Sequence, residues 1–216
     1  MEPEKFKISD ILGAIVIPII LALLIAVLAI YVNPSGQYAV LGVDGLGGTI
    51  AVIFTQGFAQ MIVLGVPLIL GLLWNKWAGG AAGFLMGSVY YMASAGLYTG
   101  YYASYGGYNF FGDISMLFYM VCAIIVGYMA GALANGSTNF KRMLGAGLTS
   151  TIITAVIQVF MNYNFSLEPA RGMAQGLWTD PVYGFILAFV PSIALGVIVP
   201  ILAKVMTWYG IQARHQ

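Results

Sequence analysis

Six long stretches of mainly apolar residues constrain this chain more than any other feature. A helix that crosses a bilayer needs roughly 20 mainly apolar residues. The six stretches that meet this requirement are residues 8–32, 48–74, 77–98, 113–134, 141–161 and 181–208. The sequence therefore predicts a single all-α domain over residues 1–216: a polytopic membrane protein with six transmembrane helices and the lipid bilayer as its main surrounding.

Charged residues are too scarce for a soluble domain. Asp, Glu, Lys and Arg make up 7% of the chain, whereas soluble domains carry about 25%. The net charge is +1 and the basic residues are not clustered, which argues against a nucleic-acid partner. With one cysteine, Cys122, and one histidine, His215, the chain has no disulfide framework and no Cys/His zinc site. No phosphate-binding loop or catalytic triad is evident, so we predict no metal, no cofactor and no enzymatic activity.

The positions of the basic residues predict an orientation. Six spans put both termini on one side, and seven of the eight Lys and Arg residues then lie on that side, with only Arg171 opposite. Cytoplasmic loops carry an excess of Lys and Arg. We therefore predict cytoplasmic termini in a multi-pass protein of the cell (plasma) membrane, with outer connections at residues 33–47, 99–112 and 162–180.

Small residues recur at four-residue spacing in three of the stretches. This spacing places them on one helix face, where the missing side chains allow another backbone to approach closely. Two interpretations stay open: helix packing within the bundle, and a smooth surface on which another membrane subunit docks. The residues are Ala22 and Ala26 in the first stretch, Gly79, Gly83 and Gly87 in the third, and Gly127 and Gly131 in the fourth.

Aromatic and polar residues gather in two of the outer connections. Nine aromatic residues lie between Tyr90 and Phe111. They form either an interfacial belt, as Tyr does in many membrane proteins, or a pocket whose rings stack on a small molecule. Arg171 either binds a ligand carboxylate or phosphate or pairs with Glu168. The candidate substrate-binding residues are Tyr91, Tyr98, Tyr101, Tyr102, Tyr105, Tyr108, Asn162, Asn164, Arg171 and Trp178.

Two segments carry a resemblance to a known family. Residues 66–87 read VPLILGLLWNKWAGGAAGFLMG, an apolar helix with a proline, a short turn and a glycine-paced helix, and residues 123–131 read AIIVGYMAG. With the six-span layout, these segments resemble the substrate-binding S-components of energy-coupling-factor (ECF) vitamin transporters. In that family an Ala-x-x-x-Ala pattern on span one meets the coupling subunit. Ala22 and Ala26 match its letters, although they lie in the middle or outer half of the span.

The resemblance implies a ligand pocket near the outer face, no ATPase of the chain's own, a transmembrane coupling subunit and cytoplasmic ATPases as partners. The acidic residue that often follows the glycine-paced helix in that family is missing, because Ser88-Val-Tyr-Tyr stands there. We predict a membrane-embedded binding or transport subunit that captures a small, vitamin-like organic molecule at the extracellular face. The alternatives are a structural or accessory subunit of a larger membrane complex and a small facilitator for a neutral solute.

Overall fold

Five helices make up most of the part of the chain that the structure describes. The computed structural model describes residues 16, 19–20, 59–102, 114–165 and 181–210. The helices are α4 (Ala59–Leu73), α5 (Lys76–Tyr102), α6 (Ile114–Ala134), α7 (Phe140–Phe165) and α10 (Pro181–Trp208). No strand occurs within these ranges. The described part of the chain is therefore all-helical, as the sequence predicts.

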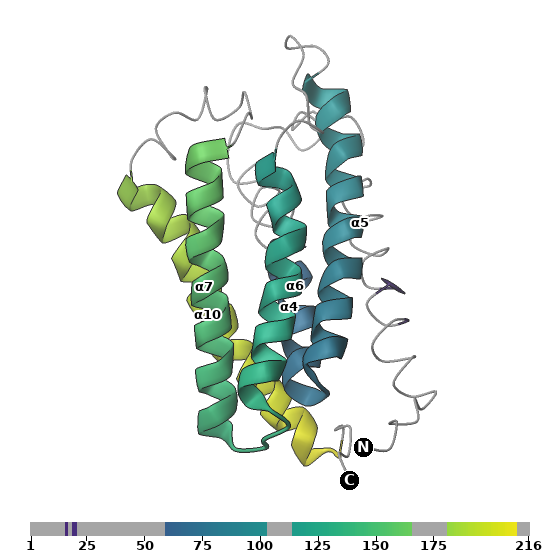
Figure 1. Ribbon diagram of the computed structural model, residues 1–216, viewed down its shortest axis with the longest axis vertical. Coiled ribbons are helices and arrows are strands. Elements are labelled where there is room, and N and C mark those ends of the chain that lie inside the picture. Colours follow the sequence, from purple (N-terminus) through teal and green to yellow (C-terminus); the bar gives the residue numbers. More distant parts are fainter. Residues whose placement is uncertain (1–15, 17–18, 21–58, 103–113, 166–180, 211–216) are drawn as a thin grey trace, which may run out of the picture.

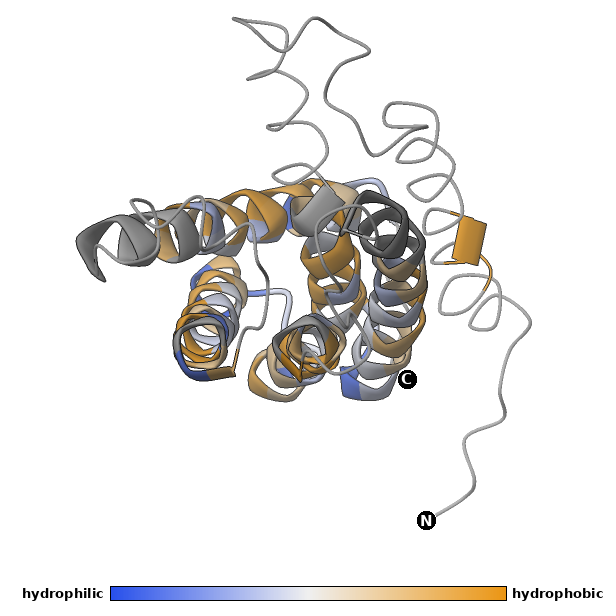
Figure 2. Ribbon diagram, turned by 90° about the horizontal axis from the view of Figure 1, so that it is seen from above, coloured by the Kyte–Doolittle hydropathy of each residue, from blue (hydrophilic) through white to orange (hydrophobic). Residues whose placement is uncertain are grey.

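Three of the helices are long and apolar enough to cross a membrane. The segments are Leu117–Ala134 in α6, Phe140–Met161 in α7 and Phe189–Trp208 in α10. Figure 2, which colours the ribbon by hydropathy, shows many hydrophobic residues along the helices of the bundle. α4 has only 15 residues, and the earlier part of its predicted span lies outside the described residues. α5 has 27 residues but contains many Gly, Ser and Tyr residues, which make it less apolar. The chain thus has the helices of a membrane protein, and the count of six spans stays a prediction.

The helices pack as a bundle in which α4 contacts all four of the other described helices. α6 packs against α4, α5 and α7. α10 packs mainly on α7 and runs obliquely across it (Figure 1). Leu68 of α4, Met86 of α5 and Val126 of α6 are fully buried in one shared apolar core. Side-chain packing at this core joins the helices.

Asparagine side chains begin two of the helices. Asn75 Oδ1 accepts a hydrogen bond from the Ala78 amide (2.8 Å), so Asn75 caps α5. It lies in the short connection between the end of α4 at Leu73 and the start of α5 at Lys76. Asn139 Oδ1 accepts one from the Lys141 amide (3.0 Å) at the start of α7. Such caps satisfy amides that have no partner within the helix. Both connections lie at the same end of the bundle (Figure 1). We call it the basic end, because Lys76 begins α5 and Lys141 and Arg142 lie in the first turn of α7.

Two helices continue beyond the ends that hydropathy predicts. α5 reaches Tyr102 and α7 reaches Phe165, whereas the predicted connections begin at residues 99 and 162. Tyr101, Tyr102, Asn162 and Asn164 are therefore helical, and their placement in loops is wrong. The physical reason is that hydropathy reports where apolar surroundings end, while a helix continues as long as its backbone hydrogen bonds do.

Candidate functional site

Buried polar side chains of the described residues lie on α7 and α10. Ser150, Thr151 and Thr154 of α7 and Ser192 of α10 are all at least 96% buried. Gln158 follows Thr154 by four residues and therefore lies on the same side of α7. We call Ser150, Thr151, Thr154 and Gln158 the polar face of α7.

The three hydroxyl groups of the polar face donate to the backbone of their own helix. Ser150 Oγ lies 2.8 Å from the Ala146 carbonyl oxygen, and Thr154 Oγ1 lies 2.9 Å from that of Thr151. Thr151 Oγ1 lies 3.0 Å from the Gly147 carbonyl oxygen. These bonds satisfy the hydroxyl protons locally and leave oxygen lone pairs as acceptors.

Neighbouring helices approach the polar face closely. Cys122 Sγ of α6 lies 3.8 Å from the carbonyl oxygen of Thr154. On the α10 side, a Cβ placed on Gly196 would lie 2.5 Å from Thr151 Oγ1. Ser192 precedes Gly196 by one helical turn and shares its side of α10. The polar face is therefore covered by α6 and α10 around Thr151 and Thr154.

Gln158 differs from the three hydroxyl residues. Its Nε2 atom is buried and has no hydrogen-bond partner within the described part of the chain. Gln158 lies seven residues before the end of α7 at Phe165, about 10 Å along the helix axis. An unpaired buried amide is destabilising. Its donor is therefore available to an acceptor that comes from outside the described residues.

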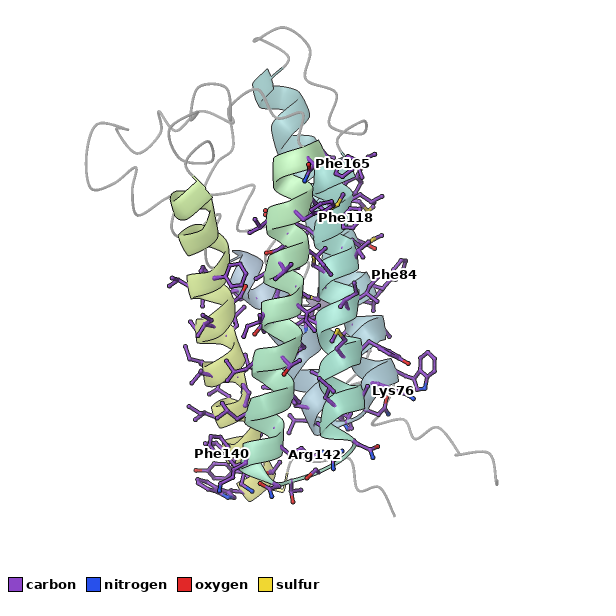
Figure 3. The ribbon with its side chains drawn as sticks, turned by 60° about the vertical axis from the view of Figure 1, so that its left-hand side comes forward. Lys76, Phe84, Phe118, Phe140, Arg142 and Phe165 are labelled. Carbon is purple, nitrogen blue, oxygen red and sulfur yellow. The ribbon has the colours of Figure 1, made fainter. Side chains whose placement is uncertain are left out.

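The formal charges of the described residues all lie at the basic end. Residues 59–102, 114–165 and 181–210 contain four cations, Lys76, Lys141, Arg142 and Lys204, and neither Asp nor Glu. Figure 3 shows Lys76 and Arg142 at the end of the bundle opposite Phe165. Gln158 and the basic residues thus occupy opposite ends of a helical bundle whose intervening length carries no formal charge.

The predicted ligand-binding residues are described only in part. Tyr91 is half-buried on α5. Asn164 is exposed, and its Nδ2 donates to the Phe160 carbonyl oxygen of its own helix (2.7 Å). Tyr98, Tyr101, Tyr102 and Asn162 lie on the last turns of α5 and α7, but the structure does not describe their side chains. Outside the described residues lie Ala22, Ala26, Tyr105, Tyr108, Arg171 and Trp178. The closure of two loops over a pocket stays a prediction.

The glycines of α5 and α6 lie where these helices meet each other and α4. A Cβ on Gly83 would overlap the Ala123 carbonyl, and Gly79 and Gly127 lie against each other's backbone. Gly87 lies against Met120, and Gly131 lies against the Asn75–Lys76 turn. This face is occupied by helices of the same chain. The five glycines therefore pack against helices of the same chain, and the docking of another subunit stays a prediction.

No described group of three His, Cys, Asp or Glu side chains is arranged to hold a metal ion. Comparison with protein-family models, curated proteins and solved structures finds no match to this chain. The candidate site is therefore defined by its own chemistry: a covered hydroxyl face with one unpaired amide donor near the end opposite the cations.

The sequence analysis missed the polar face. Its signal is the recurrence of Ser150, Thr154, Gln158 and Asn162 at four-residue spacing in an otherwise apolar helix. The four-residue spacing alone does not show whether this side of α7 faces the bundle interior or the lipid, because Ser and Thr hydroxyls can bond to their own helix backbone in either place. The burial of Ser150 and Thr154 supplies the missing information.

Proposed function

We propose that this chain is a membrane-embedded binding subunit that captures a small organic molecule near the end opposite the basic end. The observation that carries the proposal is the unpaired, buried Nε2 of Gln158. A polar group without a partner persists at a stability cost, and such costs are typical of functional sites. A ligand that presents a carbonyl oxygen or ring nitrogen would accept the hydrogen bond and remove this cost.

Orientation supports the proposal. Because Lys and Arg favour the cytoplasmic side, the four described cations indicate a cytoplasmic basic end. Gln158 then lies toward the extracellular face of the plasma membrane. The multi-pass arrangement with six spans would bring the Tyr-rich segment around residues 98–108 to that same side.

Uptake would require partners. The resemblance to ECF S-components suggests a transmembrane coupling subunit and cytoplasmic ATPases that supply the energy. The described helices carry no formal charge between their ends, so the interior suits a ligand whose buried part is neutral, since an uncompensated buried charge is costly. The proposed cargo class is a neutral, vitamin-like molecule with at least one hydrogen-bond acceptor.

The decisive experiment compares the wild-type chain with Gln158→Leu after purification in mild detergent. Mass spectrometry identifies small molecules released on denaturation, and titration with the identified compound gives its affinity. We expect Gln158→Leu to bind about tenfold more weakly, because the ligand acceptor loses its donor. We also expect its unfolding free energy without ligand to rise by about 1 kcal/mol, because an unpaired amide is removed.

Thr154→Val is the matched control on the same helix face. Its hydroxyl already donates to the backbone, so ligand affinity should change less than twofold. Equal affinity of Gln158→Leu and wild type would contradict the role of Gln158. Release of no small molecule, together with a protein partner that copurifies inseparably, would favour an accessory subunit.

A neutral-solute facilitator is the second candidate, because the polar face places hydroxyls at regular intervals along α7. The tight approach of Gly196 to Thr151 leaves little room for a continuous path. Flux of a neutral solute into liposomes that contain only this chain would favour the facilitator, whereas binding without flux favours the capture subunit.

Cysteine labelling tests the orientation. After replacement of Cys122, a single Cys is placed at Ser137 in the α6–α7 connection or at Ser166 directly after α7. An impermeant thiol reagent should label position 166 in intact cells and position 137 only after lysis. Labelling of position 137 in intact cells would reverse the orientation proposed here.

A further inference from the structure

Three cations lie close to the connection between α6 and α7. Arg142 Nε donates to the Leu133 carbonyl oxygen at the end of α6 (3.0 Å). Lys204 Nζ of α10 donates to the Thr138 carbonyl oxygen within the connection (2.8 Å). Lys141 precedes Arg142 and is exposed. These contacts bring basic residues from two helices to one short segment; we call Lys141, Arg142 and Lys204 the basic cluster.

The basic cluster has no acidic counterpart in residues 59–102, 114–165 and 181–210, which contain neither Asp nor Glu. Arg142 uses only Nε for the Leu133 carbonyl, and a guanidinium group carries four further N–H donors. A carbonyl oxygen neutralises no formal charge. The cluster therefore favours an anion that approaches from outside the bundle.

Exposed aromatic residues border the basic cluster. Trp208 is 74% exposed and follows Lys204 by one turn of α10, so the two share a side of the helix. Phe140 is also exposed and directly precedes Lys141. Figure 3 shows Phe140 and Arg142 together at the basic end. Aromatic side chains of this kind lie at headgroup depth in a bilayer.

We propose that the basic cluster binds the phosphate of an anionic phospholipid headgroup, with Phe140 and Trp208 beside the part of the acyl chains nearest to the headgroup. The charge of the cluster selects the phosphate, and the adjacent exposed rings favour a lipid over a free ion. Basic groups between membrane helices commonly hold anionic headgroups in this way. This site is independent of the ligand site proposed around Gln158.

The test measures retained lipid on the full chain in detergent by native mass spectrometry. Phosphatidylglycerol and phosphatidylcholine with identical acyl chains are added at equal concentration. Wild type should retain phosphatidylglycerol at least tenfold more strongly. Lys141→Gln should reduce this preference roughly fivefold, the effect of one cation near an anionic headgroup. Its side chain is exposed, so folding should be unaffected.

Lys76→Gln is the matched control, because it removes one cation from the same end but outside the basic cluster. Lys76 Nζ lies 5.8 Å from the Trp77 ring centroid and 5.9 Å from that of Tyr128. The preference should change less than twofold in this variant. Equal retention of both lipids by wild type, or an equal loss in Lys76→Gln and Lys141→Gln, would overturn the site. Displacement of phosphatidylglycerol by excess inorganic phosphate would overturn the assignment to a lipid.

Discussion

Between α5 and α6, glycines bring one helix backbone directly against the other, whereas between α7 and α10 side chains occupy part of the space. Gly83 lies on the Ala123 carbonyl. At the second interface, Gly147 lies against the ring of Pro200, and Gly196 lies against the Thr151 hydroxyl. The first contact is backbone on backbone. The second adds side-chain contacts to a backbone contact, because a Cβ on Gly147 would also lie 2.9 Å from the Gly196 carbonyl oxygen.

This difference separates an interface that only a backbone movement could loosen from one in which a side chain can also move. A carbonyl group within a helix cannot move without disturbing the helix hydrogen bonds. A threonine hydroxyl can reach another staggered rotamer, at the cost of its local bonds. In the proposed function, we therefore expect the α4–α5–α6 part to give structural support and the α7–α10 part, with its unpaired Gln158 amide, to adjust to a ligand.

The largest effect that we expect is that of Gly83→Leu at the glycine interface. Any side chain at this position meets the Ala123 backbone, so the helices must separate, at a cost of about 3 kcal/mol or more. Thermal unfolding of the purified protein measures the change. Gly145→Leu on α7 is the control, since beyond its own helix backbone no atom of the described residues lies within 4 Å of a Cβ there. Equal unfolding temperatures for the two variants would disprove backbone packing between α5 and α6.

A smaller effect is expected for Gly196→Ala at the second interface. The new methyl group would meet Thr151 Oγ1 and the Leu148 backbone, which should cost about 1–2 kcal/mol of unfolding free energy. Removing the hydroxyl in the double variant Gly196→Ala/Thr151→Ala should restore part of this loss. A double-mutant cycle measures the coupling, and strictly additive effects would show that the Thr151 hydroxyl is not the obstacle.

The smallest effect is expected for Gly80→Ala on α5, beside Gly79. A Cβ on Gly80 would lie 3.7 Å from Tyr128 Cβ, an ordinary contact, whereas one on Gly79 would overlap the Gly127 backbone. Gly80→Ala should change the unfolding free energy by less than about 0.5 kcal/mol. Chemical unfolding in mixed micelles measures the unfolding free energies of Gly79→Ala and Gly80→Ala. An equal loss of unfolding free energy in the two variants would show that the close contact is not confined to one side of α5.

The sequence predicts helix positions better than it predicts contacts. The stretch at residues 181–208 coincides with α10. Both the length of this apolar stretch and the polar residues at its borders indicate where the helix begins and ends. The four-residue glycine spacing indicates a face for close approach, but only the structure shows that Gly83 meets α6 of the same chain. A spacing pattern describes one helix, while a contact depends on how two are arranged.

The candidate site was less predictable than the fold. Aromatic composition directs attention to Tyr98, Tyr101 and Tyr102, whose side chains lie outside what the structure describes. Gln158 attracts no attention in the sequence, because one amide in an apolar helix is as consistent with helix pairing as with a ligand. Its significance depends on the missing acceptor, which is a property of packing.

The position of the cations determines how much free energy the membrane potential adds to a movement of the helices. Every formal charge of the described residues lies at the basic end, so a tilt or rotation of these helices that keeps this end at its membrane surface carries no formal charge through the transmembrane field. Moving one elementary charge across the membrane would require about 2.3 kcal/mol per 100 mV. The formal charges of the described residues should therefore add no electrical cost to such movements of α7 against α10.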